Sequence, residues 1–196
     1  MATTNDQIII NQIIEGDTNA FTVLVNRYKD LVFTLVLRML KNREEAEEVS
    51  QDTFIKVYKS LHTFKGDSKF STWIYKVAYH SCLDRIKKNK RKFNEVEMNE
   101  FTEHQLKLID NALDNLLEAE QKQTIQTCLN LLPSDDSFLL TLYYFDEQSL
   151  DEIAEIVGIT ANNVKVKLFR SRKKLATILK ERLQPEIIEY YERERR

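Results

Sequence analysis

The stretch from Leu150 to Leu175, LDEIAEIVGITANNVKVKLFRSRKKL, has the pattern of two helices joined by a tight turn. Apolar residues recur at helical spacing in its first half, so one face of the first helix is predicted to be buried. Gly158 supplies the left-handed backbone that a helix end needs, and Thr160 can cap the next helix through its hydroxyl group. These features predict a helix-turn-helix.

The second helix of this motif is strongly basic on its outer surface. Val164, Leu168 and Leu175 are predicted to face inward, and amide and cationic side chains cover most of the remaining surface. Amides can read adenine edges in the major groove, and cations can bind guanine or phosphate. A surface hairpin with solvated lysines is the alternative, but it leaves unexplained why the first helix is acidic and the second is basic.

Few turn-forming residues interrupt the rest of the chain. Its 196 residues include only three Gly and two Pro, and the runs of β-branched residues are short. Outside the motif, helical spacing of apolar residues predicts helices over 6–15, 18–40, 44–61, 70–92, 124–132 and 135–145. We therefore predict an all-α protein, with two small helical domains joined by an acidic, partly helical linker.

Changes in charge divide the chain into three predicted parts. Residues 1–92 form the first domain, whose last helix ends in the basic run DRIKKNKRK. Residues 93–120 are mostly acidic and form the linker, and residues 121–196 form the second domain, which contains the helix-turn-helix. The basic run is longer than a helix C-terminal dipole accounts for, so it suggests a strip that attracts phosphate.

The sequence offers no residues arranged for catalysis or metal binding. Its three His residues are isolated, and it lacks HExxH, a Gly-rich phosphate loop and GxSxG. Cys82 and Cys128 lie far apart in apolar helical contexts, which favours buried free thiols and a reducing, cytoplasmic setting. No stretch has the roughly 18 apolar residues of a membrane-spanning helix. We predict a non-enzyme with no metal, cofactor or small-molecule substrate.

Three stretches together resemble a known family, the extracytoplasmic-function (ECF) sigma factors, which are dissociable promoter-recognition subunits of bacterial RNA polymerase. The sequence EEAEEVSQDTFIKVYKSLHTFKGDSKFSTWIYKVAYHSCLDRIKKNKR resembles sigma region two, and LPSDDSFLLTLYYFDEQSLDEIAEIVGITANNVKVKLFRSRKKL resembles region four. The combination of AEEVSQDTFIKVY, F-x-GDS-x-F-x-TW and a basic helix end is the most specific part. The resemblance implies a factor that binds core polymerase, recognises minus-10 and minus-35 promoter elements and promotes transcription initiation.

The resemblance assigns core-polymerase binding to the acidic helix that follows Arg43. In the family this helix binds a coiled coil on the largest polymerase subunit, and other core subunits also contact the sigma factor. Carboxylates one helical turn apart form a face for partner arginines. The residues implied here are Glu47, Glu48, Gln51, Asp52 and Ile55.

The next loop and helix are implied to melt the promoter and to hold a flipped base of the non-template strand. A stacking aromatic ring and polar groups can offset the cost of unstacking that base. The implied minus-10 contacts are Phe64, Lys65, Gly66, Asp67, Ser68, Trp73, His80, Arg85, Lys87 and Lys88. Trp73 can equally belong to the core, as inward aromatics often do. His80 stands where many relatives have Asn.

The helix-turn-helix is implied to read the minus-35 element, with some cations on phosphates. The implied residues are Thr160, Asn162, Asn163, Lys165, Lys167, Arg170, Ser171, Arg172, Lys173 and Lys174. Many relatives have GTVKSRL where this chain has NNVKVKL, so the promoter sequence does not follow from the resemblance.

The resemblance also implies a regulatory partner, an anti-sigma factor that covers the polymerase-binding faces. Two alternatives remain at this point. A free-standing helix-turn-helix regulator would bind a palindromic site as a dimer without polymerase, but the acidic helix and the GDS loop have no role in it. An enzyme would need a catalytic constellation that the sequence does not offer.

Overall fold

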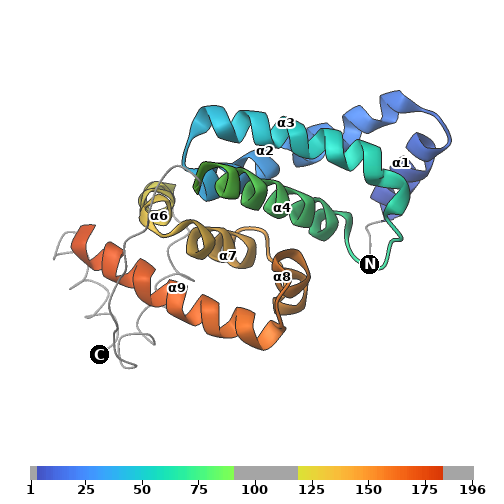
Figure 1. Ribbon diagram of the computed structural model, residues 1–196. Coiled ribbons are helices and arrows are strands. Elements are labelled where there is room, and N and C mark those ends of the chain that lie inside the picture. Colours follow the sequence, from blue (N-terminus) through green and yellow to red (C-terminus); the bar gives the residue numbers. More distant parts are fainter. Residues whose placement is uncertain (1–3, 91–118, 183–196) are drawn as a thin grey trace.

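The computed structural model describes residues 4–90 and 119–182, and all regular elements in these ranges are helical (Figure 1). The N-terminal bundle comprises α1 (Thr4–Ile14), η1 (Thr18–Ala20), α2 (Phe21–Leu40), α3 (Arg43–Ser60), η2 (Leu61–Thr63) and α4 (Phe70–Lys90). The C-terminal set comprises α6 (Ala119–Leu131), α7 (Ser134–Tyr144), α8 (Leu150–Val157) and α9 (Ala161–Arg182). The prediction of an all-α fold is confirmed.

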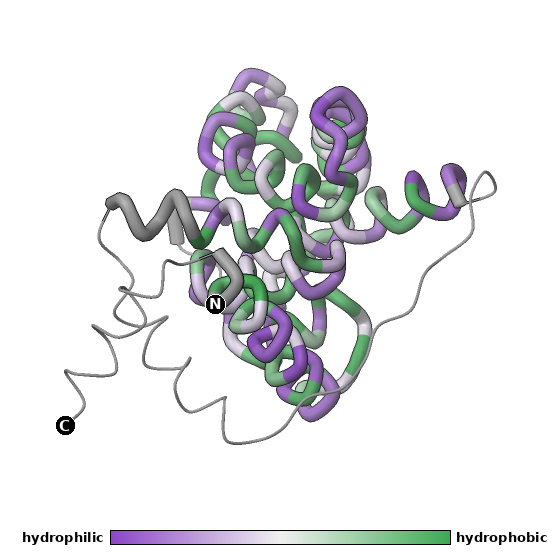
Figure 2. Tube along the Cα trace, turned by 90° about the vertical axis from the view of Figure 1, so that its left-hand side faces the viewer, coloured by the Kyte–Doolittle hydropathy of each residue, from purple (hydrophilic) through white to green (hydrophobic). Residues whose placement is uncertain are grey.

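Some predicted features lie outside the described residues. They are the linker up to residue 118, the last two residues of the basic run and the segment after Arg182. Along the helices in Figure 2, hydrophilic and hydrophobic positions alternate, as expected for helices that each bury one face. Within the described ranges, no helix combines the length and the apolar character needed to cross a membrane.

Helix α2 is the central helix of the N-terminal bundle. Val32, Leu35, Val36 and Met39 are each 1% exposed or less. A surface helix buries a single stripe, whereas α2 packs against α3, α4 and α7. The side chains of α2 therefore belong to two interfaces, one within the bundle and one with the C-terminal helices.

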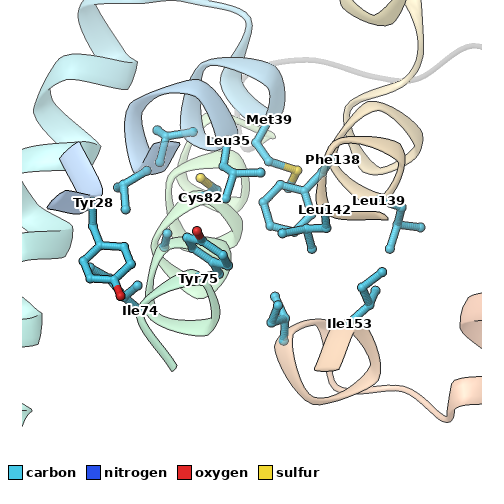
Figure 3. Close-up of a cluster of buried hydrophobic side chains, with 14 of the residues drawn as sticks. Tyr28, Leu35, Met39, Ile74, Tyr75, Cys82, Phe138, Leu139, Leu142 and Ile153 are labelled. Atoms are coloured by element: carbon cyan, nitrogen blue, oxygen red, sulfur yellow. The ribbon is translucent and has the colours of Figure 1, made fainter. Parts of the chain in front are cut away.

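The N-terminal bundle and the C-terminal helices share one continuous core. In Figure 3, Leu35 and Met39 of α2 lie close to Phe138 and Leu142 of α7. The rings of Tyr79 on α4 and Phe138 have centroids 5.1 Å apart. Helix α4 also packs against α8, so α4 and α7 lie in the middle of the molecule (Figure 1). The sequence contained no signal for this contact, because apolar periodicity does not show which helix covers which.

Polar side chains also cross between the bundle and the C-terminal helices. The Thr72 hydroxyl group donates to Gln148 Oε1 at 3.2 Å, and both residues are buried. Arg38 donates to the side chain of Gln126, and Lys41 donates to the backbone carbonyl of Leu132. Such bonds satisfy groups that the apolar contact would otherwise leave without water.

The helix-turn-helix forms as its sequence predicted. Gly158 has a φ of 72° and ends α8, and the Thr160 hydroxyl oxygen accepts a bond from the Asn163 backbone N–H at 3.3 Å. A capping box at the start of α8 was not predicted: Ser149 Oγ accepts from Glu152 N–H, and Glu152 accepts from Ser149 N–H at 2.8 Å. The sequence SLDE matches the S-x-x-E signature of this motif.

Candidate polymerase-binding and nucleic-acid interfaces

The five predicted polymerase-binding residues lie together on the outer side of α3. The opposite side of this helix is buried through Ala46, Val49 and Val57. Four of the five are exposed polar residues, and Ile55 is an exposed apolar side chain at 51%. We call this set the acidic surface: Glu47, Glu48, Gln51, Asp52 and Ile55.

Two carboxylates of the acidic surface pair with cations of the same molecule. Arg43 Nε lies 3.1 Å from Glu47 Oε1, and Arg85 Nη2 lies 2.9 Å from Glu48 Oε2. The Arg43–Glu47 pair joins two exposed side chains and contributes little stability, so a partner's arginine can replace Arg43 at small cost. Arg85 is only 19% exposed, so its pair with Glu48 is not of this kind. Asp52 is exposed and forms no ion pair with any described residue.

Phe64, the aromatic residue predicted to stack on a base, belongs to the core. Phe64 is 8% exposed, and its ring centroid lies 5.4 Å from that of Phe70 and 5.5 Å from that of Trp73. The assignment of Phe64 to DNA contact is therefore corrected to a packing role. Trp73 is half-buried in the same cluster, as the core alternative predicted. Phe64 and Phe70 meet edge to face, and Trp73 is tilted against both rings, so the three rings stabilise each other.

The polar part of the same loop reaches α8. Lys65 and Asp67 are exposed, while Gly66 takes a left-handed conformation with φ of 78°. Ser68 Oγ lies 3.4 Å from the carboxylate of Glu155, so the end of this loop lies against the first helix of the helix-turn-helix.

Lys69, the residue after Ser68, also contacts α8. Lys69 Nζ lies 2.8 Å from Glu152 Oε1. Burial alone would raise the pKa of Glu152, but the bonds from Lys69 and from Ser149 lower that pKa below its usual range. Glu152 therefore both caps α8 and pairs with the N-terminal bundle.

The other predicted minus-10 residues fall into two groups on α4. His80, Lys87 and Lys88 are exposed and free to meet a ligand from solvent. Arg85 is different, because its side chain is only 19% exposed and it bridges to Glu45 and Glu48 on α3. We therefore correct Arg85 from a DNA-contacting cation to a residue that ties α4 to α3.

The exposed residues of the predicted minus-35 set cluster at the start of α9 and on the turn before it. Asn162, Asn163 and Arg170 lie on the side of α9 away from the buried Val164 and Leu168. Lys165 flanks this side, and exposed Lys167 lies nearer the buried face, where it lines a pocket with Tyr79 and Asp135. We call this set the recognition surface: Thr160, Asn162, Asn163, Lys165, Lys167 and Arg170. It combines amide groups and cations, the two kinds of side chain that read bases and phosphates.

Two residues of the predicted minus-35 set instead anchor α9 to α7. Ser171 is fully buried, and its hydroxyl group donates to Asp136 Oδ1 at 2.6 Å. Lys174 Nζ donates to Asp136 Oδ2 at 2.6 Å. Ser171 therefore packs and does not contact DNA, and Lys174 is already paired. The helical period could have predicted that Ser171 is buried, because Ser171 follows Val164 by seven residues and shares its buried face.

Arg172 and Lys173, which lie between Ser171 and Lys174, also contact neighbouring aromatic rings. The Arg172 guanidinium lies 5.4 Å from the Tyr143 ring and 5.3 Å from the Tyr144 ring, and Lys173 Nζ lies 4.8 Å from the Phe169 ring. A cation over an aromatic face gains stabilisation that a solvated cation does not have. Arg172 and Lys173 are half-buried, so we place them outside the recognition surface.

Comparisons with known proteins agree with this geometry. Residues 24–92 match the family model for Sigma-70 region 2, and residues 122–175 match that for Sigma-70, region 4. The ECF RNA polymerase sigma factor SigW of Bacillus subtilis is 36% identical over 178 residues, covering 88% of this chain and 95% of SigW. The chain belongs to the ECF sigma factors. This sigma factor acts in transcription initiation, and a free-standing regulator is not favoured.

Further relatives place the sigma factor in the same family. The RNA polymerase sigma-H factor of Pseudomonas aeruginosa is 31% identical over 174 residues, which cover 86% of this chain and 90% of that relative. The structure of CnrH in complex with the cytosolic domain of CnrY has a TM-score of 0.63 at 20% identity, covering 91% of this chain and 99% of CnrH. The sigma factor RpoE of Bartonella quintana, in complex with the anti-sigma factor NepR, also has a TM-score of 0.63, at 18% identity. These two likenesses show the fold.

Two charged residues, Arg38 and Asp146, lie where the two halves of the sigma factor meet, and the sequence did not predict this. Arg38 of α2 is 4% exposed, and its guanidinium lies 5.8 Å from the Phe145 ring. Among the described residues, Asp146 Oδ2 is buried without a hydrogen-bond partner. Burial raises the pKa of Asp146 to about 7 although Arg38 opposes this, and burial lowers the pKa of Arg38 to about 10.

We expect Asp146 to make the stability of the sigma factor depend on pH. Between its ordinary pKa of 3.8 and about 7, the folded protein retains a proton that the unfolded chain has released. The free energy of unfolding should therefore fall as the pH rises through this window. Urea denaturation at about pH 5 and about pH 8 should show this fall in the wild type and a smaller fall in Asp146→Asn. An equal fall in both proteins would contradict the prediction, and the exposed Asp151→Asn serves as the control.

The two thiols of the sigma factor are buried, as predicted. Burial raises the pKa of Cys82 to about 12, although Lys56 opposes this, so Cys82 is a thiol at neutral pH. Thiolates, not thiols, are the nucleophilic and metal-binding form of cysteine. Over residues 4–90 and 119–182, no three His, Cys, Asp or Glu side chains gather at a possible metal site.

Proposed function

We propose that this sigma factor binds core RNA polymerase through the acidic surface of α3 and reads the minus-35 promoter element through the recognition surface of α9. The arrangement of α3 carries the first half of this proposal. Four polar side chains and Ile55 line one exposed side, and the ion pair of Glu47 with Arg43 is exposed and weak. By family resemblance, the partner is a coiled coil on the largest polymerase subunit, with further contacts to other core subunits.

The minus-35 contact is proposed to follow the usual docking of a helix-turn-helix. Helix α9 would enter the major groove with its N-terminal end, where Asn162 and Asn163 are exposed. Amide groups can pair with adenine edges, and Lys165, Lys167 and Arg170 can bind guanine or phosphate. Asp136 supports this helix from behind, because it holds Ser171 and Lys174 on the α7 side.

The minus-10 contact is proposed for the polar loop and the exposed side of α4. After the corrections for Phe64 and Arg85, the remaining residues are Lys65, Gly66, Asp67, Ser68, Trp73, His80, Lys87 and Lys88. Ser68 and the neighbouring Lys69 contact α8 in this conformation, so binding of DNA at this end of the loop would displace these contacts. Exposed polar contacts of this kind cost little to break.

We propose that residues 93–120 act as a tether between the two DNA-binding modules. Each module offers a modest number of exposed cations and should bind DNA weakly by itself. Linkage raises the effective concentration of the second module once the first is bound. The two modules share one core in this conformation, so the polymerase would have to replace that contact in order to set the spacing of the two promoter elements.

We propose cytoplasmic action with polymerase, without catalysis by this chain, and regulation by an anti-sigma factor. RpoE was solved with the anti-sigma factor NepR, and CnrH with the cytosolic domain of CnrY. These likenesses support a protein partner that competes with polymerase for the exposed faces of the bundle and of the C-terminal helices.

The proposal is tested by mixing the purified chain with bacterial core RNA polymerase that lacks any sigma subunit. A stable complex that starts transcripts at discrete sites on fragmented host DNA would support it, and the aligned start sites would define the promoter. Sequence-specific DNA binding by the chain alone, with no polymerase complex, would instead favour a free-standing regulator.

Removal of two cations from the recognition surface should weaken promoter binding by the assembled polymerase. We expect Lys167→Ala with Arg170→Ala to lower the affinity for the promoter at least about tenfold. A lost base contact costs about 1–3 kcal/mol, and a lost phosphate contact weakens binding and reduces its dependence on salt concentration. Binding of core polymerase should not change. The control is Lys29→Ala with Lys59→Ala, two exposed lysines of the N-terminal bundle. Equal promoter affinity of both double variants would contradict the role of α9.

A further inference from the structure

Val166 lies at the centre of the exposed face of α9. It is two residues from Val164 and two residues from Leu168, which are 0% and 2% exposed. At 3.6 residues per turn, side chains two positions apart point in directions that differ by about 200° around the helix axis. Val166 therefore points away from the core that buries Val164 and Leu168. Its side chain is 43% exposed.

The side chains around Val166 are mostly polar or charged. Asn162 and Asn163 precede it by one helical turn, and Arg170 follows it by one turn. All three are exposed members of the recognition surface. Val166 is therefore an apolar centre within a surface whose other members bind polar atoms.

Neither packing nor helix stability explains a valine at this position. Its side chain takes no part in the buried core, and β-branched residues form helices less readily than Ala, Lys or Gln. Phe169 is the other large apolar side chain exposed on α9, at 40%. Its ring lies 4.8 Å from Lys173 Nζ, so it already has a partner within the helix.

We infer that Val166 is a specificity-determining residue that contacts the C5-methyl group of a thymine in the minus-35 element; this rests on the proposed function of α9. The major groove exposes this methyl group at every thymine, and apolar side chains recognise it. The amides and cations around Val166 would bind polar edges of adjacent bases and phosphates. Val166 would then favour thymine over cytosine at one position, where a hydrogen-bonding side chain would not respond to the methyl group.

Replacing thymine by deoxyuridine removes only this methyl group, so it tests the contact directly. The probe is the assembled polymerase with this sigma factor, bound to promoter duplexes in which each minus-35 thymine is replaced in turn. We expect one replacement to weaken binding about fourfold for the wild type, the size expected for one buried methyl group. Val166→Ser should bind the thymine and deoxyuridine duplexes equally.

Two control variants separate this contact from other effects. Lys165→Ala, also on the recognition surface, should lower overall affinity but keep the response to the methyl group. Val23→Ser, at a valine of α2 that is 46% exposed, should change neither quantity. Because Val166 is exposed and Ser and Val have similar helix propensity, Val166→Ser should fold normally.

Three results would overturn the inference: a minus-35 element without thymine, no effect of any replacement on the wild type, or an effect that persists in Val166→Ser. Each of these leaves the proposed function intact, because the assembled polymerase still binds its promoter. Failure of the wild-type chain to assemble with core polymerase would overturn the proposed function and this inference together.

Discussion

Replacement of Asp52 by arginine is expected to abolish assembly with core RNA polymerase while leaving the fold intact. Asp52 lies in the middle of the acidic surface, is exposed, and pairs with no cation of the described residues. A like-charge contact across an interface costs several kcal/mol, so the affinity for core polymerase should fall at least about 100-fold. Competition with a labelled wild-type sigma factor for core polymerase would measure this loss.

A charge reversal elsewhere on the bundle separates this effect from a general change in net charge. Asp30→Arg on α2 changes the net charge by the same amount at another exposed position. It should retain wild-type affinity for core polymerase, and both variants should unfold at wild-type urea concentrations. Normal assembly of Asp52→Arg would show that the acidic surface of α3 has another role.

The second large effect is expected from Asp136→Ala, which removes the anchor between α7 and α9. Ser171 Oγ and Lys174 Nζ each donate to this carboxylate at 2.6 Å. In the variant the single hydroxyl proton of Ser171 can turn to the Lys167 carbonyl, 2.9 Å away, and Lys174 can reach water. We therefore expect a loss of about 2 kcal/mol in the free energy of unfolding. The recognition helix should also lose its fixed orientation, so promoter affinity should fall although Asp136 is not on the recognition surface.

Urea denaturation measures the first effect, and promoter binding by the assembled polymerase measures the second. Asp135→Ala is the matched control, since Asp135 shares the first turn of α7 but is exposed. Both carboxylates interact with the N-terminal end of the helix dipole, so the comparison isolates the anchor. Equal stability of the two variants would show that the bonds to Ser171 and Lys174 contribute nothing measurable.

The sequence alone determined the local structure of this protein. The apolar period predicted the helices, Gly158 and Thr160 predicted the turn between α8 and α9, and both residues act as expected. The inward positions Val164 and Leu168 also follow from this period, whereas the five residues of the acidic surface came from the family resemblance, and the structure shows them exposed. The helices, the turn and the inward positions depend on residues within one or two helical turns of each other, so the local sequence contains all the information they need.

Only the tertiary structure showed which of the residues predicted to contact DNA have partners inside the molecule. Phe64 packs in an aromatic cluster, Arg85 bridges to α3, and Ser171 binds Asp136. The joint core of the two helical sets and the electrostatic influence of Arg38 on Asp146 were equally absent from the local pattern. The partners of Arg85 and Ser171 are distant in the chain, and those of Phe64 lie across a non-helical loop. A period of 3.6 residues shows that a face is buried without showing what buries it.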